Sequence, residues 1–192
     1  MTRTYTLKKR AEGQAETRKR IAEAALELHS SVGPALTTIS MVAERAGVQR
    51  HTLYAHFPDE RSLSMACSGL HFERNPPPDA APWREIEDRR GRLATGLLAI
   101  YEWYERNAEV TAHVLRDGEY HPLTREVTEL RFGPSMAAYH EVLGAKLGTK
   151  QRAVLRLALS FYTWRTLVVD AGLRQTVAVK AMVQAIEGAG DL

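Results

Sequence analysis

The sequence lacks several features that mark particular classes of protein. Its 192 residues contain a single cysteine, Cys67, so no disulfide can form within the chain, which fits a reducing compartment. Cys67 lies at helical spacing from Leu63 and Leu70, so we expect it to be a small buried side chain. No run of about eighteen apolar residues is present, so we expect nothing to span a membrane. The basic start is followed by Glu, Gln and Ala rather than by an apolar stretch, unlike a secretory signal. These absences predict a cytoplasmic protein without membrane association.

Signatures of catalysis are also missing. We find no nucleophile elbow, phosphate-binding loop or zinc-protease pattern. The segment "HVLRDGEYH" contains metal-binding residue types at His113, Asp117, Glu119 and His121, but their spacing matches no metal signature and a surface turn explains them equally well. The sequence therefore predicts no catalytic residue, no metal site and no cofactor, and we expect the protein not to be an enzyme.

The positive charge is concentrated near the start of the chain. The formal net charge is +3, and the first twenty residues carry seven basic side chains against two acidic ones. A local basic arm of this kind suits a polyanion such as DNA. A solvated tail that only aids solubility explains the same charge, so both interpretations stay open at this point.

Apolar residues recur at helical spacing along most of the chain. Ile21, Ala25, Leu28 and Val32 form one stripe, which predicts a helix over residues 16–32. Two shorter helices are expected at 37–46 and 49–57, and Thr37 and Thr38 offer N-cap hydroxyls for the first of them. A fourth helix begins after Pro58 and Asp59. No segment alternates in the way that marks a β-strand.

Four prolines in "NPPPDAAP", residues 75–82, form the clearest boundary in the chain, because they cannot continue a helix. We therefore expect one domain at residues 1–72 and a second at 73–192. Helices in the second domain are expected over the following ranges: 83–106, 108–116, 122–148 with a break at Gly133 and Pro134, 149–171, and 173–187.

The segment 37–57, "TTISMVAERAGVQRHTLYAHF", has the pattern of a helix-turn-helix. Ala43 is small where two helices cross, Gly47 suits a tight turn, and Val48 and Leu53 are apolar where the second helix docks on the first. In such a motif the second helix lies in the major groove and presents its first residues to base edges. Those residues are Gln49, Arg50, His51 and Thr52.

Residues 16–70 resemble the DNA-binding domain of TetR-family transcriptional regulators, and "AGV…TLYAHFPD" is the most specific part of the match. The resemblance implies an all-helical homodimer that binds a palindromic operator, usually as a repressor, and releases it when a small molecule enters the C-terminal domain. It also implies that the following residues contact DNA: Thr38, Arg50, His51, Thr52, Tyr54 and His56.

Two positions depart from the family's pattern. The family often has Ser at the position of Gln49, where it caps the recognition helix, so we expect Gln49 to cap, to read bases or to do neither. The family also often has Lys at the position of Glu60. An acidic side chain should not approach a phosphate, and neighbouring Arg61 is the candidate to replace it.

The predicted fold is all-α, with about nine helices: an N-terminal three-helix helix-turn-helix domain and a C-terminal helical domain for ligand binding and dimerisation. The 149–171 segment is apolar around most of its circumference, so we expect a homodimer through residues 149–187. Val179, Met182, Val183 and Ile186 of the last helix should complete that interface, although a buried central helix in a monomer would also explain the pattern.

A pocket for a small-molecule effector of unknown identity is expected among the helices of the second domain. Apolar and aromatic side chains with a few polar tips suit small organic ligands. The candidates for its wall are Tyr101, Tyr104, His113, Phe132, Met136, Tyr139 and Trp164. Each of them would serve equally as ordinary core.

The leading hypothesis is thus a ligand-responsive, sequence-specific DNA-binding transcriptional regulator that recognises a palindromic operator. An alternative is a small-molecule binding protein whose DNA-binding domain is degenerate, which the departures at Gln49 and Glu60 leave open. A third, an enzyme that uses the segment from His113 to His121, would require a bound metal.

Overall fold

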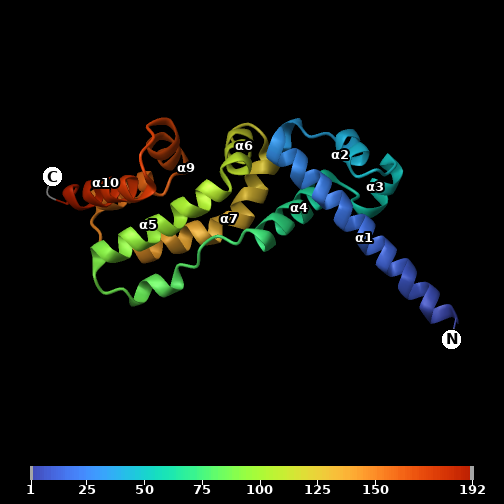
Figure 1. Ribbon diagram of the computed structural model, residues 1–192, viewed down its shortest axis with the longest axis horizontal. Coiled ribbons are helices and arrows are strands. Elements are labelled where there is room, and N and C mark those ends of the chain that lie inside the picture. Colours follow the sequence, from blue (N-terminus) through green and yellow to red (C-terminus); the bar gives the residue numbers. More distant parts are fainter. Residues whose placement is uncertain (1, 191–192) are drawn as a thin grey trace. The chain divides into compact units, whose positions relative to one another are not determined.

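A computed structural model describes residues 2–190, with side chains described from Lys8 onward. All regular structure in this range is helical (Figure 1), which confirms the predicted all-α class. The described residues form ten α-helices and three shorter turns of 3₁₀ or π-helix. The contacts divide the chain into two compact units, Met1–Pro76 with Glu109–Arg131, and Pro77–Ala108 with Phe132–Leu192. Each unit is described in turn.

The first unit begins with a helix much longer than the sequence predicted. A start near Glu16 was expected, but α1 extends back to Thr2, because no proline interrupts these residues and Gly13 is tolerated within the helix. The elements of this unit are α1 (Thr2–Ser31), the 3₁₀ turn η1 (Pro34–Leu36), α2 (Ile39–Arg45), α3 (Arg50–His56), α4 (Glu60–Arg74), α6 (Ala108–Gly118) and the first part of α7 (Pro122–Leu143).

One apolar core holds the first four α-helices together. Ile21 and Ala25 of α1, Ala43 of α2 and Leu53 of α3 are each at most 3% exposed. The small side chains of Ala25 and Ala43 allow the helix backbones to approach closely. Cys67 on α4 belongs to the same core, which confirms its expected place as a small buried side chain, and burial raises the pKa of its thiol to about 12.

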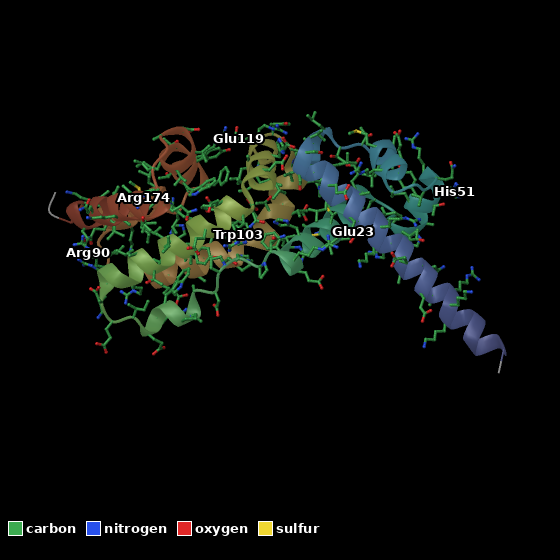
Figure 2. The ribbon with its side chains drawn as sticks, viewed as in Figure 1. Glu23, His51, Arg90, Trp103, Glu119 and Arg174 are labelled. Atoms are coloured by element: carbon green, nitrogen blue, oxygen red, sulfur yellow. The ribbon has the colours of Figure 1, made fainter. Side chains whose placement is uncertain are left out.

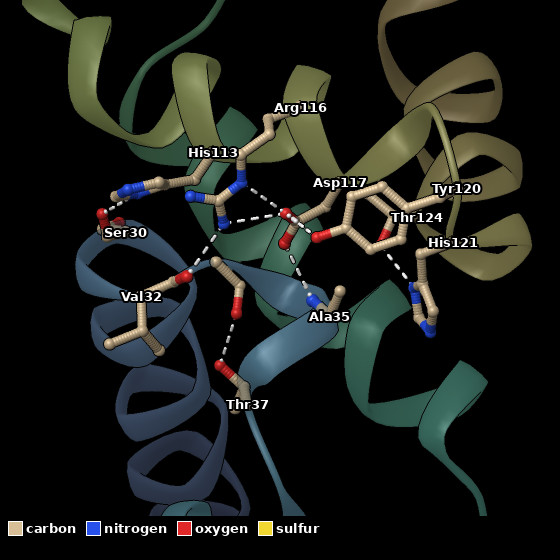
Figure 3. A network of polar contacts seen from close by, with 11 residues as sticks. Ser30, Val32, Ala35, Thr37, His113, Arg116, Asp117, Tyr120, His121 and Thr124 are labelled. Atoms are coloured by element: carbon tan, nitrogen blue, oxygen red, sulfur yellow. Dashed lines mark hydrogen bonds and ion pairs between the residues drawn. The ribbon is translucent and has the colours of Figure 1, made fainter.

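A buried carboxylate, that of Asp117, ties the end of α6 to the loop before α2 (Figure 3). Asp117 is 0% exposed. Its oxygens accept hydrogen bonds from the Ala35 backbone N–H at 2.9 Å, Arg116 Nε at 2.8 Å and the Tyr120 hydroxyl at 2.9 Å. Gly33, at φ 99°, leaves the space that this cluster fills, since a β-carbon there would collide with Arg116 and Asp117.

Two further contacts join α6 to the carboxyl end of α1. His113 Nδ1 donates to the Ser30 carbonyl at 2.6 Å, and Arg116 donates to the Val32 carbonyl at 3.0 Å (Figure 3). The last carbonyls of a helix have no partner within the helix, so these donors satisfy groups that would otherwise need water. The α6–α7 segment is therefore a structural part of the first unit.

The second unit begins with the 3₁₀ turn η2 rather than with the long helix predicted from residue 83. The carboxylate of Asp88 accepts the backbone N–H groups of Arg90 and Gly91, and this cap fixes the start of α5. The elements of this unit are η2 (Ala81–Glu85), α5 (Arg89–Arg106), the remainder of α7, α8 (Thr149–Ala158), α9 (Phe161–Trp164), the π-helical turn η3 (Arg165–Asp170) and α10 (Gln175–Gly188).

Helix α7 passes without interruption through Gly133 and Pro134, so the predicted break is wrong. Proline removes one backbone donor and leaves the carbonyl four residues earlier, that of Leu130, without its helix partner. The side chain of Leu130 is 51% exposed, so solvent reaches this side of the helix and can hydrate the carbonyl.

The single helix predicted over 149–171 is broken at Leu159 and Ser160. The Ser160 hydroxyl accepts the Tyr162 backbone N–H at 3.3 Å and begins α9. The break frees backbone carbonyls inside the core, and two tyrosine hydroxyls from α5 satisfy them. Tyr101 donates to Ala158 at 2.9 Å, and Tyr104 donates to Leu159 at 2.7 Å.

The last helix, α10, packs on α5 and α8 of its own chain. Val179, Val183 and Ile186 were expected to meet a second subunit, but they are 4%, 2% and 0% exposed and belong to the core of their own unit. Met182 is half-buried. The exposed apolar positions of this helix are instead Val177 and the small residues Ala185 and Gly188.

We expect Asp117→Asn to destabilise the protein by about 1–2 kcal/mol at pH 7, because the charged acceptor of several hydrogen bonds is lost. Burial alone would raise the pKa of the Asp117 carboxyl, but hydrogen bonds from Arg116, Ala35 and Tyr120 outweigh it and hold the pKa below its ordinary value. The carboxylate therefore stabilises the fold above its unfolded-state pKa of about 4, and this contribution disappears as the pH falls through the lower folded-state pKa.

Denaturant unfolding of the wild type and the variant at pH 7 and at successively lower pH measures this difference. Asp170→Asn, at an exposed aspartate, is the control and should leave stability unchanged. Equal stability of Asp117→Asn and wild type at pH 7 would contradict the role given to this carboxylate.

Candidate nucleic-acid interface

Helices α2 and α3 form the predicted helix-turn-helix. Gly47 has φ 63°, the left-handed conformation that the tight turn requires. The turn is closed by the Gly47 N–H, which donates to Glu44 at 3.0 Å, and by the Val48 N–H, which donates to Ala43 at 2.9 Å. The spacing of small and apolar residues in 37–57 thus leads to the expected local geometry.

Thr38 occupies the N-cap of α2, as expected. Its hydroxyl accepts the Met41 backbone N–H at 3.2 Å and so satisfies one of the free donors at the start of the helix. The side chain is exposed, so the same hydroxyl is also open to a phosphate.

Helix α3 separates its buried residues from its exposed ones. Leu53 and Phe57 are both 0% exposed and fix the helix to the core. Gln49, Arg50 and His51 are exposed together at the start of the helix, and Figure 2 shows His51 on the outer surface of the unit. Hydrogen-bonding side chains are therefore exposed at the start of α3, the part of the helix that we expected to face base edges.

The remaining predicted contacts lie further along the same helix. Thr52 is half-buried, with its hydroxyl 3.4 Å from His51 Nε2. Tyr54 is 47% exposed, and His56 is half-buried. Gln49 stands at the N-cap position but makes no side-chain capping bond, so its amide is free to contact another molecule.

Arg18 of α1 also supports α3, and we did not identify it from the sequence. Its guanidinium carbon lies 4.0 Å from the centre of the Phe57 ring, and it donates to the backbone carbonyl of His56. A cation at the carboxyl end of a helix complements the helix dipole and its unpaired carbonyls. The available signal was the position of Arg18, three residues before the buried Ile21 on the same helix.

The departure at Glu60 lies in the first turn of α4. Asp59 accepts the Ser62 backbone N–H at 2.6 Å and caps the helix, while Glu60 is exposed beside it. Arg61 donates from Nε at 2.9 Å and from a terminal nitrogen at 2.7 Å to Glu126 on α7. We expected Arg61 to replace the family's lysine at a phosphate, but this ion pair occupies two of its donors.

Most of the predicted effector-binding residues meet in an aromatic cluster of the second unit. Tyr104 lies 6.5 Å from Tyr101 and 6.1 Å from Trp164, measured between ring centres. Phe132 and Tyr139 lie 6.4 Å apart and join this group through Trp103, which stacks on Phe132. Tyr101, Tyr104 and Trp164 are each at most 2% exposed.

Two predicted members are not part of these ring contacts. His113 belongs to the first unit, where it hydrogen-bonds Ser30, and Met136 is half-buried on α7. Trp164 has a feature that the sequence did not indicate. Its buried Nε1 has no hydrogen-bond partner, whereas the hydroxyls of Tyr101 and Tyr104 are satisfied by backbone carbonyls.

Neither a metal cluster nor a membrane span is found in the described part of the chain. Within residues 2–190 no three His, Cys, Asp or Glu side chains form a group that could hold a metal ion. None of the described helices is long and apolar enough to cross a membrane.

Sequence comparison identifies relatives of the first unit. Residues 21–66 match the family described as "Bacterial regulatory proteins, tetR family". The HTH-type transcriptional repressor KstR of Mycolicibacterium smegmatis is 42% identical over 64 residues, which are 33% of this chain and 31% of the repressor. The match thus spans about a third of that relative's length.

Two longer matches extend into the second unit. An uncharacterized HTH-type transcriptional regulator of Mycobacterium bovis is 29% identical over 143 residues, 73% of this chain and 69% of that protein. The crystal structure of a tetR-family transcriptional regulator from Streptomyces coelicolor superposes with a TM-score of 0.60, covering 91% of this chain and 80% of that one, at 17% identity. The structural likeness is therefore one of fold.

We expect Thr38→Ala to lower the free energy of unfolding by about 1 kcal/mol, because the N-cap acceptor of α2 is lost. Thr38→Ser keeps the hydroxyl and should remain within a few tenths of a kcal/mol of the wild type. Thermal or urea unfolding of the three proteins measures the effect. Indistinguishable stabilities of the Ala and Ser variants would contradict the capping role.

Proposed function

We propose that this chain, a member of the TetR family of bacterial regulatory proteins, is a sequence-specific DNA-binding transcriptional regulator rather than an enzyme. It acts in the cytoplasm as a homodimeric repressor of a palindromic operator and is released by a small-molecule ligand. The observation that carries the proposal is the start of α3, where Gln49, Arg50 and His51 are exposed together on a helix whose Leu53 and Phe57 are wholly buried. Residues 1–72 recognise DNA, and residues 73–192 bind the ligand and dimerise.

The residues of α3 have different chemical roles in this proposal. Arg50 can make a bidentate contact to guanine and Gln49 one to adenine, while the Thr52 methyl group can touch a thymine methyl. His51 lies at the same end of the helix and adds a ring nitrogen to base readout. The side chains that contact phosphates, and so fix the position of the protein without reading sequence, are Thr38, Tyr54 and His56.

An exposed apolar surface supports dimerisation through α8 and α10. Leu157 of α8 is 57% exposed and Val177 of α10 is 39% exposed, although both belong to a well-packed unit. Ala153 lies about one turn before Leu157 on α8, and Ala185 and Gly188 lie about two and three turns after Val177 on α10. All three are exposed, and small residues let the helices of two subunits approach closely. A symmetric pairing of these two helices would bury this surface.

The aromatic cluster of the second unit supports a ligand site. Trp164 Nε1 is a buried donor without an acceptor, which costs free energy that a bound acceptor would recover. The following predicted residues would lie in or beside that site: Tyr101, Tyr104, Phe132, Met136 and Tyr139. His113 is not part of this site, because it lies on α6 and hydrogen-bonds the Ser30 carbonyl.

Arg50→Ala should relax base preference at one position of each half-site by about 1–3 kcal/mol, because a bidentate base contact is lost. Tyr54→Phe should weaken binding to all duplexes alike, since it removes a phosphate contact. Parallel selections from a random duplex pool, followed by measured affinities for single-base variants, separate the two effects.

Wild-type protein that binds every duplex equally at moderate salt would contradict sequence-specific recognition. If the protein bound a hydrophobic ligand but retained no DNA at low salt, the alternative of a small-molecule binding protein with a degenerate DNA-binding domain would be correct.

Leu157→Glu should convert the dimer into a monomer at micromolar concentration, because a charge would be buried in the centre of the proposed interface. Leu130→Glu is the matched control, since Leu130 is similarly exposed, at 51%, but lies on α7. Light scattering gives the mass of both variants. A wild-type monomer, or a Leu157→Glu dimer, would contradict the proposed interface.

A further inference from the structure

The N-terminal half of α1 has no packing partner in the chain. Every side chain from Lys8 to Glu16 is exposed, and the first buried residue of the helix is Ile21. Figure 1 shows this part of α1 extending past α2, α3 and α4 of its own unit. The fifteen residues from Thr2 to Glu16 would span about 22 Å as a helix. A segment of this length without tertiary contacts is marginal in water, so a partner that packs along it would stabilise it.

The charge of this segment indicates the chemistry of that partner. Residues 8–20 carry six Lys or Arg side chains and two carboxylates, Glu12 and Glu16. Both carboxylates lie on one face of the helix. The same face carries Lys8, Lys9, Lys19 and Arg20. The opposite face has no acidic residue, and it carries Arg10, Gln14, Thr17 and Arg18.

The face without acidic residues is the one nearest the recognition helix. Arg18 on this face contacts the Phe57 ring and the His56 carbonyl at the end of α3. Gln14 lies one turn before Arg18, and Arg10 lies two turns before it. A duplex bound to α3 would therefore lie on the side of α1 that presents cationic and hydrogen-bonding groups.

We propose that residues 2–17 form a helical arm that binds the DNA sugar–phosphate backbone immediately outside the half-site read by α3. The inference rests on the proposed function, since it requires that α3 binds DNA. The arm neutralises phosphates and so adds affinity that depends on salt but not on base sequence. Its helical continuity with α1 fixes its direction, so it contacts only DNA that continues beyond the half-site.

Charge variants of the arm test the contact with phosphates. Arg10→Gln removes one cation from the face without acidic residues, and it should weaken binding to an extended duplex several-fold and reduce the slope of log K against log salt by about 1. Base preference should stay the same. Arg89→Gln removes the same charge from an exposed position of the second unit, and this control should bind like the wild type.

Gly13 allows a test of the helical form at constant charge. A β-carbon at this position would meet no atom within 4 Å, so Gly13→Ala introduces no clash and favours the helix, while Gly13→Pro interrupts it. We expect the Ala variant to bind at least as tightly as the wild type. The Pro variant should lose affinity as the charge variant does.

The measurement is fluorescence anisotropy at several salt concentrations, with the selected palindrome in two forms. One duplex carries about ten extra base pairs at each end, and the other ends flush with the half-sites. Circular dichroism verifies that each variant is folded. The arm variants should bind the extended duplex more weakly than the wild type does, and they should bind the flush duplex with the same affinity as the wild type.

The outcomes distinguish the arm from the regulator itself. If the wild type binds the palindrome and the Arg10→Gln variant matches its control, the arm is overturned and the segment is a solvated tail, with the proposed function intact. If the charge variant binds DNA more weakly but the Gly13→Pro variant binds like the wild type, the helical form of the arm is overturned. Failure of wild type to bind any duplex would overturn both the arm and the proposed function.

Discussion

The burial of Leu53 and Phe57 is the constraint on which the interface depends. Helix α3 has seven residues, too few to be stable alone, and its exposed side chains contribute almost no apolar contact. Both anchors are 0% exposed, in a core formed with α1, α2 and α4. This core supplies the free energy that orders the helix and leaves Gln49, Arg50 and His51 free to contact another molecule. Arg18 strengthens the same attachment through the ring of Phe57.

The features predicted well from the sequence are those determined by contacts between near neighbours. The all-α class, the N-cap at Thr38, the turn at Gly47 and the docking of Leu53 follow from spacing within about twenty residues. In these segments local propensity, periodicity and turn chemistry agree with the tertiary packing. The burial of Cys67 follows for the same reason, because it shares a stripe with Leu63.

The features that were missed depend on contacts between distant parts of the chain. The helix predicted over 149–171 breaks at Leu159, and the freed carbonyls accept hydrogen bonds from the hydroxyls of Tyr101 and Tyr104. The sequence of this segment does not indicate these distant donors. Likewise, the packing of α6 on the end of α1 follows from the hydrogen bonds of Asp117 and His113, whose partners lie more than eighty residues away. The burial of Val179 against its own chain, rather than a second one, required the tertiary arrangement as well.

The two units differ in the chemistry of their interiors. The second unit contains a cluster of aromatic rings, and the unpaired Nε1 of Trp164 is a buried donor within it. By contrast, the first unit contains the polar network around Asp117, which holds the turn before α2 in place. The segment that contains Asp117 was expected within residues 73–192, but its contacts place it in the first unit.

The central claim is that α3 reads base sequence. The most direct test is the equilibrium affinity of the wild-type protein for a selected palindrome and for a scrambled duplex of the same composition, both at about 0.15 M salt. We expect the palindrome to bind at least about a thousandfold more tightly, as specific regulators do. Equal affinity for the two duplexes would contradict the account.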